Sequence, residues 1–177
     1  MTPVTLTLCE TCRQPTSSSH TPCALCGCPL CEDCILSPPT GTFSLLDEIP
    51  KNLAHTQYCR FCFTDQVEPE IVKYEETLEK AKSIYIFFTT QRKEIPLIRK
   101  SKEIYKIDAC EDRDETILRL AYKAAAAGFN AVVNTEVLHE KKRNHAYQKT
   151  IWRGTGSPAM IDESKLDRQY KQDQMYR

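Results

Sequence analysis

The feature that most constrains the fold of this chain is a set of four C-x2-C pairs within its first 62 residues. The pairs are Cys9/Cys12, Cys23/Cys26, Cys31/Cys34 and Cys59/Cys62. Two residues between paired cysteines let one tight turn present both sulfurs to a single tetrahedral ion at about 2.3 Å. Four such pairs supply two sites of four cysteines each, and we expect two zinc ions per chain. Two further cysteines, Cys28 and Cys110, are surplus to this pattern.

Disulfide bonding and redox catalysis are the alternative roles for closely spaced cysteines. Disulfides persist in oxidising compartments, and the N-terminal segment MTPVTLTLC lacks the basic start and long apolar stretch of a secretory signal. A redox motif needs one CxxC ahead of a helix, not four pairs in succession. No apolar stretch is long enough for a membrane span. We therefore expect a soluble cytoplasmic protein in which zinc replaces a hydrophobic core that the intervening segments are too polar to build.

The gaps between the four pairs carry further information. Ten residues separate the first pair from the second, four the second from the third, and 24 the third from the fourth. His20 precedes the second pair and Gly27 follows it directly. This order resembles a FYVE-type zinc finger over about residues 6–65. The resemblance implies a cross-brace in which one ion is bound by Cys9, Cys12, Cys31 and Cys34 and the other by Cys23, Cys26, Cys59 and Cys62.

Two other arrangements accommodate the same eight ligands. A RING domain is also cross-braced, although it usually has a histidine among its central ligands. Two consecutive zinc ribbons would pair the cysteines sequentially. The two cross-braced arrangements differ from the ribbons in which pairs share an ion, and the sequence leaves all three open.

The residues with which FYVE domains bind phosphatidylinositol 3-phosphate are almost absent. The segment SSSHTPCALCG occupies the place of the basic motif, and only His20 remains of the lipid-contacting set. Phosphate recognition needs cations, whereas residues 1–65 contain three basic and six acidic residues, a net charge that anionic lipid repels. We therefore predict a non-enzymatic, protein-binding adaptor. Phosphatidylinositol 3-phosphate binding and RING-type ubiquitin ligase activity are the alternative functions.

The remainder of the chain predicts a second domain of a different kind. Residues 66–82 read as a connecting helix, with Pro69 early, acids near the start and lysines at the end. Residues 83–161 contain strand-like runs (SIYIFFTT, EIYKID, NAVVNTEVLHE, AYQKTIWRGTG) and one helical segment, DRDETILRLAYKAAAAGFN, that Gly128 ends. The economical solution is an α+β fold, an antiparallel sheet covered by one helix. Residues 162–177 are a charged tail.

Several positions in this second domain resemble the YbjQ-like family of small α+β domains, over about residues 83–161. The matching positions are Ala127, Gly128, Asn130, Ala131, Val132, Val133, Gly154 and Thr155. The resemblance implies a domain that can form homo-oligomers, and some members are labelled as heavy-metal binders. Here, however, Cys110, His139 and His145 are the only soft ligands, and their spacing is not that of a metal site.

Catalysis and nucleic-acid binding are not expected. No HExxH, GxSxG or phosphate-binding glycine loop is present. Lysine and arginine together number 24, as do aspartate and glutamate, and the basic clusters QRKEIPLIRKSK and KKRNH are typical of a solvated face rather than a phosphate-binding one.

Overall fold

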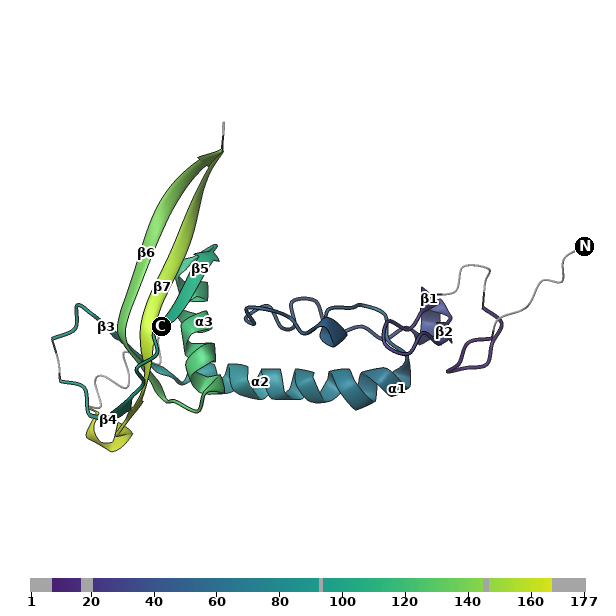
Figure 1. Ribbon diagram of the computed structural model, residues 1–177, viewed down its shortest axis with the longest axis horizontal. Coiled ribbons are helices and arrows are strands. Elements are labelled where there is room, and N and C mark those ends of the chain that lie inside the picture. Colours follow the sequence, from purple (N-terminus) through teal and green to yellow (C-terminus); the bar gives the residue numbers. More distant parts are fainter. Residues whose placement is uncertain (1–7, 17–20, 93, 145–146, 167–177) are drawn as a thin grey trace, which may run out of the picture. The chain divides into compact units, whose positions relative to one another are not determined.

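A computed structural model describes residues 8–16, 21–92, 94–144 and 147–166 of the chain. The chain divides into an N-terminal unit, Met1–Glu75, and a C-terminal unit, Glu76–Arg177. Their helices and strands are labelled in Figure 1. In the described part of the chain, no helix combines the length and apolar character needed to cross a bilayer.

The N-terminal unit contains little regular secondary structure. Its elements are the antiparallel pair β1 (Thr21–Pro22) and β2 (Pro29–Leu30), 3₁₀ turns at Glu32–Cys34 and Lys51–Leu53, α1 (Arg60–Cys62) and a π-type turn at Phe63–Val67. The turn runs directly into α2 (Glu68–Lys82), in the segment expected to be helical, and the division between the two units falls within α2. Apart from the start of α2, the elements of this unit are all two to five residues long.

Two small clusters of buried side chains stabilise this unit. One consists mainly of cysteines around Leu30. The other involves the long insertion before the last cysteine pair: Phe43 packs edge-on against Tyr74 with ring centroids 5.4 Å apart. Tyr58 is fully buried, and its hydroxyl donates to the carbonyl oxygen of Asn52 at 2.9 Å. Phe43 therefore belongs to a satellite core, whereas Ile49 in the same insertion is 43% exposed.

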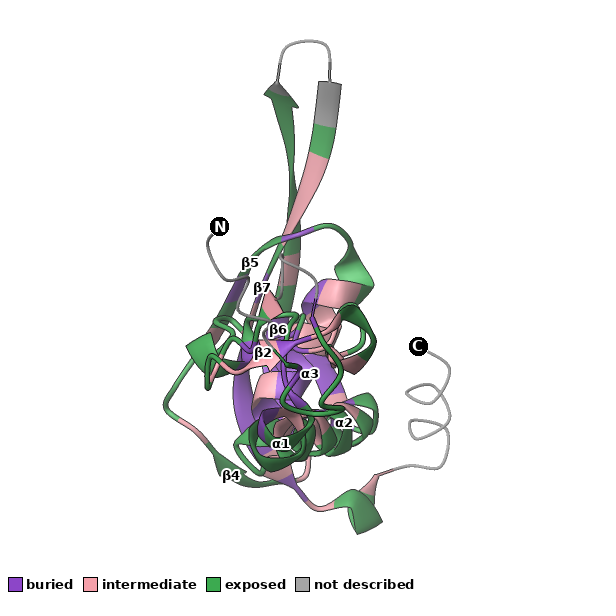
Figure 2. Ribbon diagram, turned by 90° about the vertical axis from the view of Figure 1, so that its right-hand side faces the viewer, coloured by how far each residue is buried: buried purple, intermediate pink, exposed green. Residues whose placement is uncertain are grey.

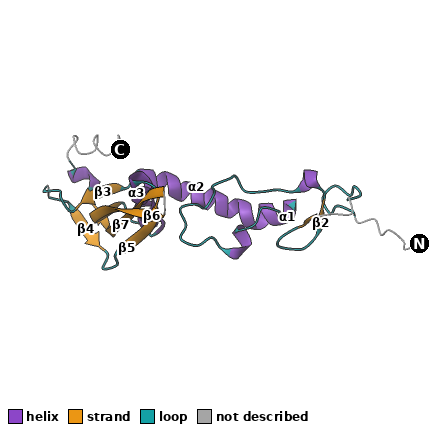
Figure 3. Ribbon diagram, turned by 90° about the horizontal axis from the view of Figure 1, so that it is seen from above, coloured by secondary structure: helices purple, strands orange, loops and turns teal. Residues whose placement is uncertain are grey.

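The C-terminal unit is a five-stranded sheet with one helix (Figure 3). Its elements are β3 (Tyr85–Phe88), β4 (Leu97–Lys100), β5 (Tyr105–Cys110), α3 (Arg113–Ala126), β6 (Ala131–Asn144) and β7 (Tyr147–Ile161). The strand order is β3-β6-β7-β4, and β5 also pairs with β7. The α+β class predicted from the sequence is confirmed.

Two details of the sheet differ from the sequence expectation. The β3–β6 pair is parallel, with Tyr85 opposite Ala131, so the sheet is mixed rather than wholly antiparallel. The segment expected to be a connection contains the extra strand β4, which pairs with the end of β7. Strand direction depends on the path of the intervening chain, and all four residues of β4 are exposed, so no apolar alternation marks the strand in the sequence.

Helix α3 packs on one face of the sheet, against β5, β6 and β7. Asp112 is its N-cap, since its carboxylate accepts from the backbone N–H of Glu115 at 2.6 Å. Close packing depends on Gly154 of β7, because a Cβ there would lie 2.5 Å from Cγ2 of Thr116 and 3.1 Å from Cδ1 of Leu120. Gly154 is therefore needed for α3 to pack closely on the sheet.

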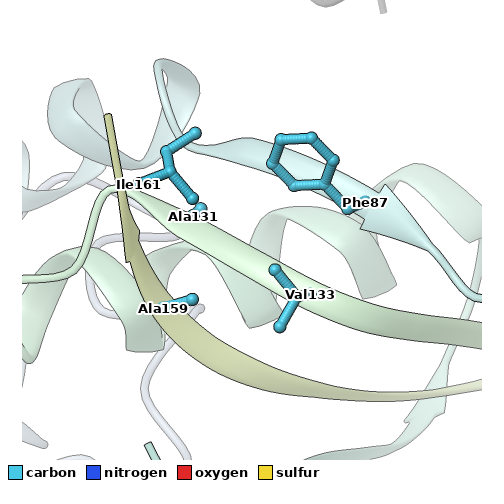
Figure 4. Close-up of a cluster of buried hydrophobic side chains, with 5 residues drawn as sticks. All are labelled: Phe87, Ala131, Val133, Ala159 and Ile161. Carbon is cyan, nitrogen blue, oxygen red and sulfur yellow. The ribbon is translucent and has the colours of Figure 1, made fainter. Parts of the chain in front are cut away.

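Side chains of β3, β6 and β7 on the face of the sheet opposite α3 form a second apolar cluster (Figure 4). Its buried members are Phe87, Ala131, Val133, Ala159 and Ile161. Side chains alternate across a strand, so residues of one strand contribute to both faces. The outer parts of β6 and β7 continue as a two-stranded hairpin that projects from the sheet and is mostly exposed (Figure 2).

Asn130 anchors the turn between α3 and β6 to the end of β7. Its amide oxygen accepts from the N–H of Ile161 at 2.9 Å, and its amide nitrogen donates to the carbonyl oxygen of Ile161 at 3.1 Å. The same nitrogen donates to a carboxylate oxygen of Glu163 at 3.0 Å. The asparagine of the YbjQ-like pattern thus has a structural role, in which one side chain continues the backbone pairing of the sheet.

We expect Asn130→Ala to lower the free energy of unfolding of the C-terminal unit by about 2–3 kcal/mol, because it leaves two backbone groups of the buried Ile161 without partners. Urea unfolding followed by fluorescence of Trp152, the only tryptophan, measures this unit. The exposed Lys106→Ala is the control and should change stability by less than about 0.5 kcal/mol. Equal stability of both variants would contradict the anchoring role.

Candidate metal centre

The first cysteine cluster contains the four residues that the FYVE-like resemblance assigns to one ion. The sulfurs of Cys9, Cys12, Cys31 and Cys34 all lie within 4.8 Å of one another. Cys9 and Cys12 occupy a turn closed by the Arg13 N–H donating to the Cys9 carbonyl at 2.9 Å. Cys31 and Cys34 flank a second turn, in which the Cys34 N–H donates to the Cys31 carbonyl at 3.0 Å.

The second cluster brings together the sulfurs of Cys23, Cys26, Cys28 and Cys59, again within 4.8 Å of one another. The turn between Cys23 and Cys28 is closed by two 2.9 Å backbone hydrogen bonds, and Gly27 adopts a positive φ of 75° within it. Cys59 reaches the cluster across the long insertion because its neighbour Tyr58 forms an antiparallel bridge with Leu36.

Cys62, the fourth ligand predicted for this site, lies next to the second cluster, but its sulfur is not among the four that all lie within 4.8 Å of one another. Its N–H donates to Sγ of Cys59 at 3.4 Å, and its side chain is buried among the other cysteines. Burial raises the pKa of Cys62, as do its hydrogen bonds with the thiols of Cys59, Cys26 and Cys23. The cysteine spacing predicted Cys62 as the fourth ligand and left Cys28 over, because Cys28 belongs to none of the four C-x2-C pairs.

The two clusters interleave along the chain. The first and third pairs meet in one cluster, and the second and fourth contribute to the other. This is the order of a cross-brace, and it excludes consecutive zinc ribbons, in which Cys9 and Cys12 would meet Cys23 and Cys26. FYVE and RING domains share the cross-brace, so the arrangement does not separate them.

The sulfur separations fit a tetrahedral zinc site. Ligands at about 2.3 Å from a tetrahedral ion are about 3.8 Å apart. The Sγ atoms of Cys12 and Cys31 are 3.6 Å apart, and those of Cys26 and Cys59 are 3.8 Å apart. A site made of four cysteine sulfurs, with no oxygen or nitrogen ligand, is typical of structural zinc. Both clusters are therefore able to bind a metal ion of this class.

Backbone N–H groups stabilise one thiolate in each cluster. Hydrogen bonds from the backbone N–H groups of Cys12 and Cys31 lower the pKa of Cys9 to about 6. Burial acts to raise the pKa of Cys23, but the backbone N–H groups of Cys26 and Cys59 outweigh it and bring the value to about 6. The Cys59 N–H lies 3.3 Å from Sγ of Cys23. The backbone N–H groups therefore favour the thiolate forms of Cys9 and Cys23, which are the forms that bind a metal cation.

Neighbouring thiols oppose further ionisation. Hydrogen bonding with Cys31 raises the pKa of Cys34 to about 12, with burial and the thiols of Cys12 and Cys9 adding to the effect. Burial raises the pKa of Cys28, and hydrogen bonds with Cys26 and Cys59 raise it further. Four thiolates in one small space repel one another, and a divalent cation relieves this repulsion.

A surface pocket of about 800 Å³ lies beside the second cluster. Three of its lining residues are thiols of that cluster, Cys26, Cys28 and Cys59. The rest of the lining is Glu10, Thr11, Arg60, Phe61, Thr64 and Asp65. The Phe61 side chain is 76% exposed. Sequence reasoning missed this residue, although its place between the two cysteines of the last pair was the available signal.

Of the other candidate residues, the two that the structure describes, Cys110 and His139, do not join a cluster. Cys110 is buried, and burial raises the pKa of its thiol. His139 packs against Trp152 with ring centroids 5.0 Å apart. Of the residues that the structure describes in the C-terminal unit, no three lie together as metal ligands. His20 and His145 lie outside the described residues.

Comparison of the chain with protein-family models, with curated proteins and with solved structures gave no match. The function is therefore inferred from the two cysteine clusters and the surface around them.

Proposed function

We propose that this chain is a zinc-dependent adaptor, whose N-terminal unit uses two zinc ions to hold a protein-binding surface in place. The observation that carries the proposal is the interleaving of two four-cysteine clusters. A zinc ion with four protein thiolates has no open position for a substrate. Its role is then to supply folding free energy and to fix the loops that the cysteines join.

The surface beside the second site suits a protein segment. Phe61 offers an exposed aromatic side chain next to an open pocket whose lining includes thiols of the second cluster. Aromatic residues next to pockets are frequent binding hot spots. The pocket also has two carboxylates, Glu10 and Asp65, against the single cation Arg60. We infer that the partner contributes an apolar side chain with a neighbouring basic residue.

We also propose a family for each of the two units. The cross-brace and the position of Gly27 support a FYVE-like module, and the structural roles of Asn130 and Gly154 support a YbjQ-like domain. The edge strand β4 exposes Leu97 and Ile98, which suits self-association of the C-terminal unit. An oligomer would display several zinc modules and raise their apparent affinity through avidity.

We expect Phe61→Ser to abolish partner binding while leaving zinc content unchanged, because Phe61 is exposed and is not a ligand. The experiment is affinity capture with the full zinc-loaded chain, followed by calorimetry with the purified partner. Val72→Ser is the matched control, since Val72 is another exposed apolar residue of this unit, 49% exposed and outside the pocket lining.

Positive results in either of two other assays would contradict the adaptor function. Selective pelleting with vesicles that contain phosphatidylinositol 3-phosphate would assign the module to membranes. Discharge of ubiquitin from a loaded conjugating enzyme would instead assign it to ubiquitin ligases. Capture that is equal for the Phe61→Ser and Val72→Ser variants would show that the pocket is not the binding surface.

A further inference from the structure

The second cluster has a fifth thiol beside it, whereas the first does not. The first contains Cys9, Cys12, Cys31 and Cys34. The second contains four thiols within 4.8 Å of one another, and Cys62 is buried against them, with its backbone N–H donating to Sγ of Cys59 at 3.4 Å. Zinc in a structural site takes four ligands, so five thiols compete for four positions.

Three of the five thiols are common to both possible ligand sets. Cys23, Cys26 and Cys59 lie together with Cys28, and Cys62 is buried in the same cluster as Cys23 and Cys59. We propose that Cys28 and Cys62 are alternative fourth ligands of the second zinc ion. The inference rests on the proposed zinc binding and goes beyond it, since it gives the second site a reserve ligand that the first site lacks.

The two alternative ligands approach from different sides. Cys28 is partly exposed and lines the pocket next to Phe61, in the loop between Gly27 and Pro29. Cys62 is only 4% exposed and lies at the end of α1. The carbonyl of Cys28 accepts from the Cys23 N–H at 2.9 Å, which ties its loop to a residue of the shared set. Cys28 is therefore the solvent-side ligand and Cys62 the interior one.

The exchange between them balances without any other reactant. As the Cys28 sulfur forms its bond to zinc, the zinc–sulfur bond of Cys62 breaks, and the proton lost by the Cys28 thiol passes to the departing Cys62 thiolate. Zinc keeps four thiolate ligands, and the net charge of the site does not change. A partner that occupies the pocket would contact Cys28 but not Cys62, which is not part of the pocket lining.

Zinc content of full-length variants tests the proposal. Purified wild-type chain should contain two zinc ions, and the single variants Cys28→Ser and Cys62→Ser should each retain two. The double variant should contain one. The matched control is Cys12→Ser in the first cluster, which has no fifth thiol and should contain one zinc ion.

Release of zinc to an excess of a coloured chelator provides a second measurement that does not require substitution of the buried Cys62. We expect the Cys28→Ser variant to release its more labile ion several-fold faster than wild type, because no reserve thiol recaptures zinc when one ligand detaches. Cys110→Ala is the control and should match wild type.

Each outcome has a distinct meaning. Loss of one zinc ion from either the Cys28→Ser or the Cys62→Ser variant, or identical release from wild type and Cys28→Ser, would overturn the exchange while leaving two-zinc binding intact. Fewer than two zinc ions in the wild-type chain would instead overturn the proposed function.

Discussion

Removal of zinc by a strong chelator is expected to unfold the N-terminal unit and leave the C-terminal unit folded. The N-terminal unit has one small aromatic satellite core and a second cluster made mostly of cysteines. Without a cation, the thiols of that cluster contribute little apolar burial and repel one another when ionised. Each zinc ion contributes about 10 kcal/mol or more of folding free energy in small zinc domains, which exceeds the total stability of many small domains.

Amide hydrogen exchange measures this prediction residue by residue. Protection at Leu30 and Tyr58, both buried in the N-terminal unit, should disappear with chelator and return when zinc is added. Protection at Val132 and Ala159 in the sheet of the C-terminal unit should persist, because β6 and β7 pair from Ala131 opposite Ala159 to Asn144 opposite Tyr147, with one register shift, and no metal is involved. Persistent protection at Leu30 with zinc removed would show that the unit folds on its own core.

Zinc affinity at the first site is expected to fall steeply as the pH is lowered, by at least about a hundredfold for each pH unit near neutrality. The hydrogen bond of Cys31 with Cys34 lowers its pKa, but burial and the thiols of Cys12 and Cys9 outweigh this and raise it. The pKa of Cys34 is raised to about 12. Both thiols are protonated near neutral pH without metal, and each must release its proton when zinc binds. These two protons alone correspond to a change of two in the logarithm of the affinity per pH unit.

The dependence should become steeper below about pH 6. Cys9, with a pKa of about 6, is a thiolate above this pH and contributes no proton, but below it a further proton must leave on binding. Competition with a chelator of known proton affinity, over about pH 5.5 to 8, gives the slope. The Cys12→Ser variant and the double variant Cys28→Ser/Cys62→Ser, each expected to retain one zinc ion, assign the two sites. Calorimetry in buffers of different ionisation enthalpy counts the protons directly. A slope near zero would mean that the free thiols are already ionised.

The cysteine spacing was enough to predict the chemistry of the N-terminal unit. A C-x2-C pair is a local motif, because two residues between the sulfurs fit one turn, and the turns at Cys9/Cys12 and Cys31/Cys34 form in this way. The helix over Glu68–Lys82 and the helix that Asp112 begins and Gly128 ends could also be predicted, since capping residues and helix-compatible charges act locally.

Features that depend on distant segments could not be predicted in the same way. The parallel pairing of β3 with β6 depends on the route of the chain through β4, β5 and α3, which no local pattern specifies. Strand β4 is exposed at the sheet edge and lacks the apolar alternation that identifies half-buried strands. The pocket next to Phe61 is formed by residues near Glu10, Cys28 and Asp65, which only folding brings together.

What the sequence determined by itself is therefore the kind of candidate metal ligand, the number of candidate metal sites and the α+β class of the C-terminal unit, because these follow from residue type and short-range spacing. Only the tertiary structure decided which cysteine pairs share a cluster, and only it placed Cys28 beside Cys23, Cys26 and Cys59. The physical reason is that metal coordination requires sulfurs to meet within a few ångströms. Cys59 meets that requirement only because the bridge between Leu36 and Tyr58 closes the long insertion.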